Sequence, residues 1–252
     1  MEDLEARFHE AKLACVVTAE PLERSWRGGA IEIVQIDIAR ERRGETFRIW
    51  RGAASNRVLA TNVDARERQL VLMVHEPRRR FEATISAFQP VPPRTRVLYA
   101  DKHKRVIEQF TTETKRHFLC GMDESHLFIA QLPRPAPTVA AAHRVLRPDW
   151  LRDEERRQGE WFFATPTTED AVKIAQATPA LTMSEIGIAQ AARLPRAGRE
   201  HVADEVVVIG QRIFVRGAIR HPDHRTVRFL LWMRAVPNTE AFEQPSGVRW
   251  VD

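Results

Sequence analysis

Cysteine is scarce in this chain, since Cys15 and Cys120 are the only two among 252 residues. Two thiols can form at most one disulfide, which excludes the small disulfide-stapled class of secreted domain and favours a reducing, cytoplasmic location. Long apolar runs are also missing, because no stretch approaches the roughly 18 residues that a membrane helix needs. The charged N-terminal segment lacks the apolar core of a secretory signal. We therefore expect a cytoplasmic protein without a membrane partner.

Several motifs with a known mechanism are absent as well. The chain contains no Walker loop, no GxGxxG after a strand, no CxxC spacing of a zinc finger and no HExxH. These absences argue against nucleotide-driven enzymes and standard metalloproteases. No repeat of fixed period and no low-complexity tract is visible either.

Basic residues exceed acidic ones by a small margin. There are 39 Lys and Arg against 34 Asp and Glu, which gives a net charge of +5 and an isoelectric point near 9.7. A basic surface favours a polyanionic partner, either DNA or RNA, although a mildly basic surface without such a partner is the simpler alternative.

The pattern of apolar and turn residues predicts an α+β chain in two parts. We expect a mixed α/β domain over residues 1–148, a linker over 149–158, and a β-rich domain with two short helices over 159–252. Thr138 is the expected N-cap of a helix that ends before Pro148, and Thr167 or Thr168 caps a second helix to about Ala177. Ser184 is expected to begin a third helix.

A hairpin is predicted at residues 213–232, with Pro222 and Asp223 as its two-residue turn. His221 and His224 are then directly opposed across the two strands. Continuing that register places Val215 opposite Leu230.

The histidines of this hairpin form the first candidate site. Together with His201 and either Asp204 or Glu205 they are a ligand set for zinc or iron, in a cupin-like arrangement with an open position for chemistry. Two alternatives stay open at this point. The histidines can be solvated turn residues, or they can contact phosphates together with neighbouring arginines.

A second candidate lies in the predicted hairpin 117–131. His117, Cys120, Asp123 and His126 are the residue types of a nucleophilic Cys–His site or a mixed zinc site. His117 and Cys120 have opposite parity in a strand, however, and Cys120 between apolar neighbours fits a core thiol equally well.

Arginine clusters form the third candidate. We expect phosphate contacts from one group in each half of the chain, namely Arg78, Arg79 and Arg80 in the first and Arg216, Arg220 and Arg225 in the second.

The segment Arg157-Gln158-Gly159-Glu160-Trp161 and the later residues His201, His221-Pro-Asp-His224 and Glu240 follow a recurring order. In this order, residues 157–252 resemble uncharacterised bacterial and phage proteins that carry an RQGD-type motif. The match departs at Glu160, which replaces the usual acid, and at His201, which stands alone where a His-x-His pair is typical. The resemblance implies a domain of its own and a link to mobile elements or defence systems.

The leading functional expectation is a nucleic-acid-interacting accessory protein of such a system, acting with a protein partner. A metal-dependent enzyme, such as a hydrolase, centred on His201, His221 and His224 is the first alternative. A protein-interaction module without chemistry is the second.

Overall fold

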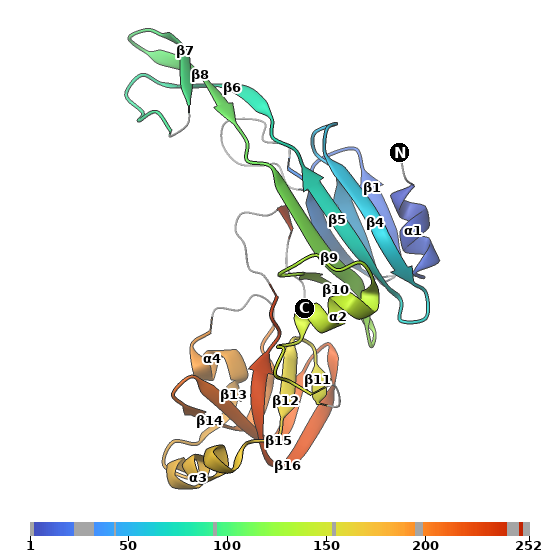
Figure 1. The fold of residues 1–252 in the computed structure, drawn as a ribbon, viewed down its shortest axis with the longest axis vertical. Helices are drawn as coiled ribbons and strands as arrows, with labels where there is room; N and C mark the ends of the chain where they lie inside the picture. Colours follow the sequence, from blue (N-terminus) through green and yellow to red (C-terminus); the bar gives the residue numbers. More distant parts are fainter. Residues whose placement is uncertain are drawn as a thin grey trace.

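The computed structural model describes residues 3–22, 33–42, 44–92, 95–152, 155–194, 199–240 and 247–248. It is elongated, with a thin projection at one end, a sandwich of sheets in the middle and a third body of sheet and helices at the other end (Figure 1). Within the described residues, no helix has both the length and the apolar character needed to cross a bilayer.

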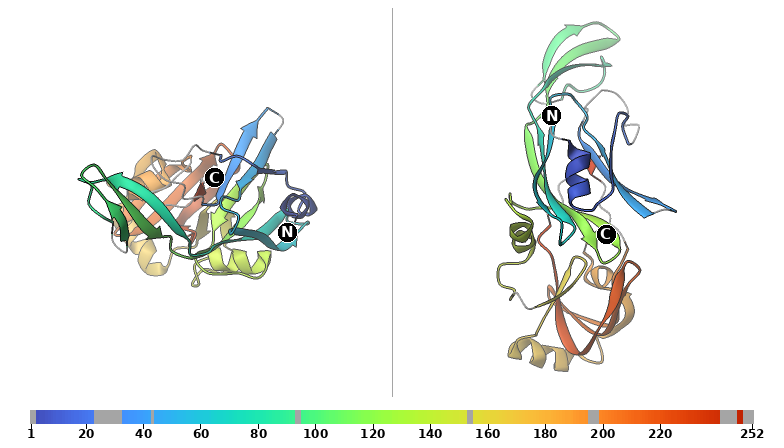
Figure 2. Two further views of the ribbon diagram at one scale, coloured as in Figure 1. Left: turned by 90° about the horizontal axis from the view of Figure 1, so that it is seen from above. Right: turned by 90° about the vertical axis from the view of Figure 1, so that its right-hand side faces the viewer.

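The middle body consists of two sheets and the helix α1 (Leu4–Glu10). One sheet has the order β1-β3-β2-β17, with bounds Cys15–Thr18, Gly44–Trp50, Gln35–Glu41 and Gly247–Val248. The other has the order β10-β9-β5-β4, with bounds His126–Gln131, Thr114–Asp123, Gln69–Glu76 and Arg57–Asp64. Phe8 of α1, Phe47 of β3 and Phe118 of β9 are fully buried in one apolar core, so the helix and both sheets share it (Figure 2).

The helix α2 (Val139–Leu146) covers the opposite face of the second sheet. Val71, Leu119 and Leu146 bury one another there. The side chain of Thr138 accepts a hydrogen bond from the Ala141 backbone N–H, which confirms the predicted N-cap.

The projection is a three-stranded antiparallel sheet, which we call the arm and define as residues 78–110. Its order is β6-β8-β7, with bounds Arg80–Ser86, Lys104–Phe110 and Arg96–Ala100. The Thr111 backbone N–H donates to the Arg79 carbonyl at 2.8 Å, so the two chain passages at the base of the arm are joined.

The third body contains a six-stranded sheet of order β11-β12-β16-β15-β14-β13. The bounds are Arg156–Gln158, Trp161–Ala164, His224–Pro237, Arg212–His221, Val202–Ile209 and Met183–Gly187. The helices α3 (Thr168–Ala177) and α4 (Ile188–Ala192) accompany this sheet. Residues 156–158 of the predicted linker therefore form a strand of this sheet.

The predicted mixed α/β class of the first half is wrong, because the protein is mostly β. In the described part of residues 1–148, ten strands accompany only two short helices. The polar stretch 104–110 forms the strand β8. Its pairing with β6, about twenty residues away, comes from contacts that local propensity does not encode.

The helix predicted to begin at Ser184 is also wrong. Ser184 lies in the edge strand β13, opposite Glu205 of β14, and α4 begins only at Ile188. Ladder hydrogen bonds to β14 replace the cap that a serine side chain would supply.

Candidate metal centre

The turn between β15 and β16 places two histidines opposite each other. His221 pairs with His224 across Pro222 and Asp223, as predicted. Beyond the turn the predicted register is wrong, because irregularities between Ile219 and His221 and between Val215 and Gly217 shift it. Val215 consequently lies opposite Met233 rather than Leu230.

A third histidine joins the pair from the start of the neighbouring strand. The ring of His201, which precedes β14, is stacked on that of His221 with centroids 4.2 Å apart, and it lies 5.4 Å from the ring of His224. One ring nitrogen of each residue lies within 4.8 Å of the others. In the described residues, this is the one group of His, Cys, Asp and Glu side chains with metal-ligand spacing.

His201 is buried without a hydrogen bond. Its side chain has no solvent exposure, and among the described residues neither ring nitrogen has a hydrogen-bond partner. The nearest charged group is Glu160, whose Oε1 lies 3.4 Å from Nδ1 of His201. A buried polar atom without a partner costs about 1–3 kcal/mol, so this imidazole requires an explanation.

Gly159 brings the backbone against the histidines. Its φ is +55°, and a Cβ added there would lie 2.8 Å from Nε2 of His224 and 3.0 Å from Nε2 of His201. Both Nε2 atoms therefore border the same small space beside Gly159. A side chain at this position would fill that space, so glycine is required both by its conformation and by the close approach.

His221 makes two hydrogen bonds through its ring. Nδ1 accepts from the Asp223 backbone N–H at 3.1 Å, and Nε2 lies 3.3 Å from the Arg199 carbonyl. Burial, followed by the proximity of His201 and His224, lowers the pKa of His221 to about 4. Burial also lowers the pKa of His224. Both rings are accordingly neutral at pH 7, which is the form that coordinates metals.

Asp223 fixes the turn against the middle body. Its buried carboxylate contacts Arg40 of β2, His126 of β10 and Arg199 at 3.3, 3.6 and 3.3 Å. His221 and Asp223 are buried and His224 is half-buried, although Pro222 between them is exposed, so the histidines are not solvated turn residues. Two of the side chains around Asp223, Arg40 and His126, belong to the middle body, so they connect the two bodies at this point.

A pocket opens beside His224 at the junction of the two bodies. Its volume is about 30 Å³, which accommodates one water or an ion. Residues of both bodies line it, including Asp123, His126, Arg157, Gly159, Glu160 and Glu240. His224 is the member of the triad that borders the pocket, so access to the site is from this side.

The carboxylates predicted as further ligands are engaged elsewhere. Asp204 accepts from the Ala218 backbone N–H at 2.7 Å and contacts Arg220 at 2.5 Å. Glu205 forms a two-bonded ion pair with Arg216. The acid beside the histidines is Glu160 instead. The sequence offered one signal for it, namely its place directly after Gly159 in the RQGE segment.

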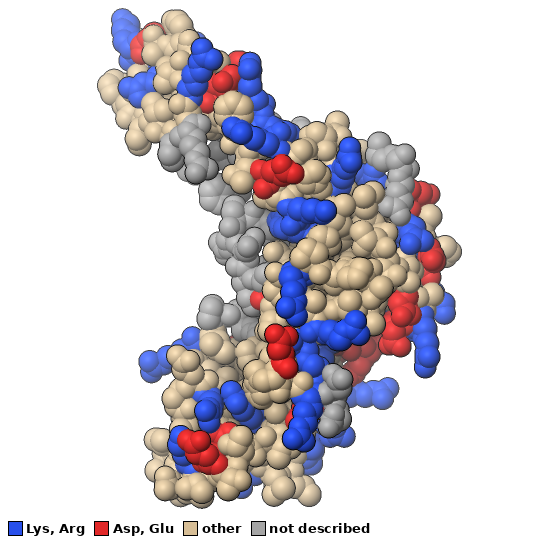
Figure 3. Space-filling view, viewed as in Figure 1, with Lys and Arg blue, Asp and Glu red and all other residues tan. Residues whose placement is uncertain are grey.

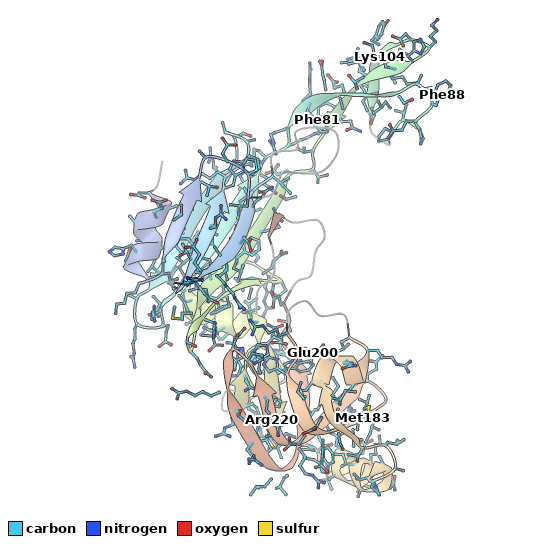
Figure 4. All side chains as sticks on the ribbon, turned by 180° about the vertical axis from the view of Figure 1, so that it is seen from behind. Phe81, Phe88, Lys104, Met183, Glu200 and Arg220 are labelled. Atoms are coloured by element: carbon cyan, nitrogen blue, oxygen red, sulfur yellow. The ribbon has the colours of Figure 1, made fainter. Side chains whose placement is uncertain are left out.

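The predicted arginine clusters do not form one surface. Arg78, Arg79 and Arg80 lie at the base of the arm, whereas Arg216, Arg220 and Arg225 lie in the third body. Figure 4 shows this separation, with Lys104 and Phe88 on the arm and Arg220 at the opposite end of the molecule. Arg216 and Arg220 are paired with carboxylates, and Arg225 lies 3.9 Å from Glu124.

The second candidate site is not assembled as a nucleophilic pair. Cys120 is fully buried in the apolar core, where burial raises the pKa of its thiol. His117 is partly exposed on the same strand, and Asp123 and His126 belong to the junction pocket. Both cysteines are free thiols.

Comparison with models of protein families, with curated proteins and with solved structures finds no match to this chain. The functional argument therefore depends on the geometry of the site.

Proposed function

We propose that the protein is a metal-dependent enzyme whose metal is held by His201, His221 and His224. The observation that carries this proposal is the buried ring of His201, which has no hydrogen bond to the described part of the chain and whose Nε2 borders the same space as Nε2 of His224. A cation in that space would bind the lone pair of His201 Nε2, which has no hydrogen-bond partner among the described residues.

The surroundings of His201 resemble the support of a metal ligand. Metal-bound histidines generally donate their second ring N–H to a carboxylate or a carbonyl, which sets the tautomer. Glu160 lies on the Nδ1 side of His201, which leaves Nε2 for the metal. The same arrangement makes Glu160 a positioning residue.

Metal binding requires small ring movements. Three nitrogens bound to one zinc at 2.0–2.1 Å are about 3.3 Å apart, whereas the nitrogens of the triad lie within 4.8 Å of one another. Coordination through Nε2 of His221 would require the ring proton to move from Nε2 to Nδ1, so it would replace both the hydrogen bond to the Arg199 carbonyl and the one from the Asp223 N–H.

Three imidazoles with one open position are the ligand set of catalytic zinc, and iron is the second choice for such a set. A zinc ion held by these three residues would supply hydrolytic chemistry, because such ions activate water at neutral pH. The pocket beside His224 has room for a water. Hydrolysis is therefore the reaction class that this site supports best.

The proposal is tested by metal content. Untagged protein is dialysed against micromolar zinc and then against buffer, and zinc is counted by mass spectrometry. We expect about one zinc per chain, and we expect its loss in His201→Ala and in His221→Ala/His224→Ala. His9→Ala/His103→Ala is the matched control, because both of these histidines are exposed and distant from the triad.

Absence of zinc and iron from the wild type would contradict the proposal, as would equal loss of metal in the control. Thermal melting with and without zinc supplies a second measurement, since a ligand that binds only the folded state raises its stability. Zinc should raise the Tm of the wild type and of the control, but not that of the triad variants.

A further inference from the structure

The net charge of the protein is located on the arm. The segment 78–110 has eight Lys and Arg against three Asp and Glu, which gives +5, and the whole chain also has +5. The residues outside the arm therefore contain equal numbers of basic and acidic side chains. Figure 3 shows Lys and Arg side chains gathered on the arm, where it stands away from the middle body.

The strand register assigns the side chains of the arm to two faces. Arg80 pairs with Phe110, Arg96 with Glu108 and Tyr99 with Val106. Since alternate residues share a face, one face presents the cations Arg80, Arg96 and Lys104, the rings of Tyr99 and Phe110, and the acids Glu82 and Glu108. We call this set the outer face. Glu108 forms an ion pair of 2.8 Å with Arg80, which leaves Arg96 and Lys104 as the cations available to a ligand.

The opposite face of the arm is partly covered by its own chain. Ile107 is fully buried there, and Phe81 and Ile85 are partly buried. Arg105 donates to the Gln89 carbonyl at 3.3 Å and Gln109 contacts Thr95 at 3.4 Å, which ties the connection after β6 to this side. On the outer face Arg96, Tyr99, Lys104 and Phe110 are exposed, and on the opposite face Val97 is exposed as well.

Aromatic rings accompany the cations on the outer face. Tyr99 is 53% exposed and Phe110 is 42% exposed, and the guanidinium of Arg78 lies 4.6 Å from the centre of the Phe110 ring. Phe88, near the far end of the arm, is 89% exposed. These rings are therefore accessible to a ligand that approaches the arm.

We propose that the outer face of the arm binds single-stranded nucleic acid. The cations neutralise phosphates, and the exposed rings of Tyr99 and Phe110 offer faces on which unpaired bases stack. Cations alone would fit any polyanion, whereas their combination with accessible rings favours unpaired bases over a duplex, whose bases are already stacked. This binding site is separate from the proposed metal centre and does not depend on it.

The test uses the full chain and a fluorescent 20-nucleotide oligo(dT) in a salt titration. We expect binding that weakens steeply with salt. Arg96→Ser/Lys104→Ser removes two cations of the outer face, so the slope of log K against log salt should fall by about 1.4. Arg66→Ser/Arg134→Ser removes the same charge from exposed positions outside the arm and should leave that slope unchanged.

The rings are tested separately from the charge. Tyr99→Ala/Phe110→Ala should weaken binding by about tenfold or more with the salt slope preserved, because stacking is lost and phosphate contacts remain. Tyr99→Phe keeps the ring and should bind as the wild type does. Circular dichroism verifies that each variant retains its sheet content.

Three outcomes would overturn the proposal. They are no binding to oligo(dT) at low salt, equal weakening in the control outside the arm, and tighter binding to a 20-base-pair duplex or to phosphatidylserine vesicles than to the single strand. The duplex and the vesicles present phosphates without unpaired bases, so they distinguish general attraction to anions from the proposed stacking.

Discussion

Glu160 lies beside the ring of His201, which forms no hydrogen bond with the residues that the structure describes. Its Oε1 is 3.4 Å from Nδ1 of His201, and both side chains are almost fully buried. A carboxylate at this distance from an imidazole fixes the ring orientation and increases its strength as a ligand.

Replacing this acid gives a prediction at the residue scale. We expect Glu160→Gln to lower zinc affinity by about 10–100-fold, because the amide keeps the shape but removes the charge behind His201. Competition with a chromogenic chelator measures the change. Glu185→Gln, an exposed acid of the third body, should have wild-type affinity. Unchanged affinity in Glu160→Gln would show that this acid does not support the metal ligands.

At the scale of the element, helix α3 begins at a capping residue that the sequence alone predicts. The Thr167 hydroxyl accepts a hydrogen bond from the Asp170 backbone N–H, and the Asp170 carboxylate accepts one from the Thr167 backbone N–H. The two bonds form a capping box. Burial opposes the charge of Asp170, but bonds from Arg212 and Thr167 outweigh it and lower the pKa of that carboxyl. The cap therefore also ties α3 to Arg212 of β15.

Two adjacent threonines allow a matched test of this cap. Thr167→Ala should reduce the free energy of unfolding by about 1 kcal/mol, since it removes the acceptor for the first turn. Thr168→Ala, one residue later at an exposed position, should have little effect. Urea denaturation of both variants gives the comparison. A larger loss in Thr168→Ala would contradict the assignment of Thr167 as the cap.

Elements that depend on a few adjacent residues could be predicted from the sequence, and those that depend on distant residues could not. Caps at Thr138 and Thr167 and the pairing of His221 with His224 depend on a few adjacent residues, and the structure confirms them. The predicted pairing of β15 with β16 was wrong beyond the turn, because irregularities insert unpaired residues into the strands. The alternation of apolar and polar residues does not reveal such insertions. Glu160 was not predicted as the partner of His201 because the two residues meet only after β12 and β14 join one sheet.

At the scale of the whole molecule, side chains from both halves of the chain meet at the junction. His143 of α2 lies 2.6 Å from Oε1 of Gln69 and 3.4 Å from the Arg157 guanidinium of the third body. Burial, and then the positive charge of Arg157, lowers the pKa of His143 to about 4. The folded protein accordingly excludes a proton that the unfolded chain accepts near pH 6.5.

This difference predicts the pH dependence of stability. The contribution of His143 to the free energy of unfolding is complete above about pH 6.5 and is lost as the pH falls towards about 4. In that window the His143 side chain binds a proton only in the unfolded chain. Replacing His143 by Gln should flatten the dependence over this range. Urea midpoints measured with a chelator between pH 4 and pH 8 test it. An identical slope in wild type and variant would show that His143 does not contribute.

The hydrogen bond between Thr111 and Arg79 closes the base of the arm, so the chain leaves the middle body and returns to it at almost the same point. The fold of the rest of the molecule therefore does not need the arm for continuity. The electrostatic repulsion between copies of the protein does depend on the arm, because the residues outside 78–110 contain equal numbers of acidic and basic side chains. Copies of the protein without the arm would lack the mutual repulsion that keeps molecules apart in solution. The arm therefore has, besides the proposed binding face, the whole net charge of the chain.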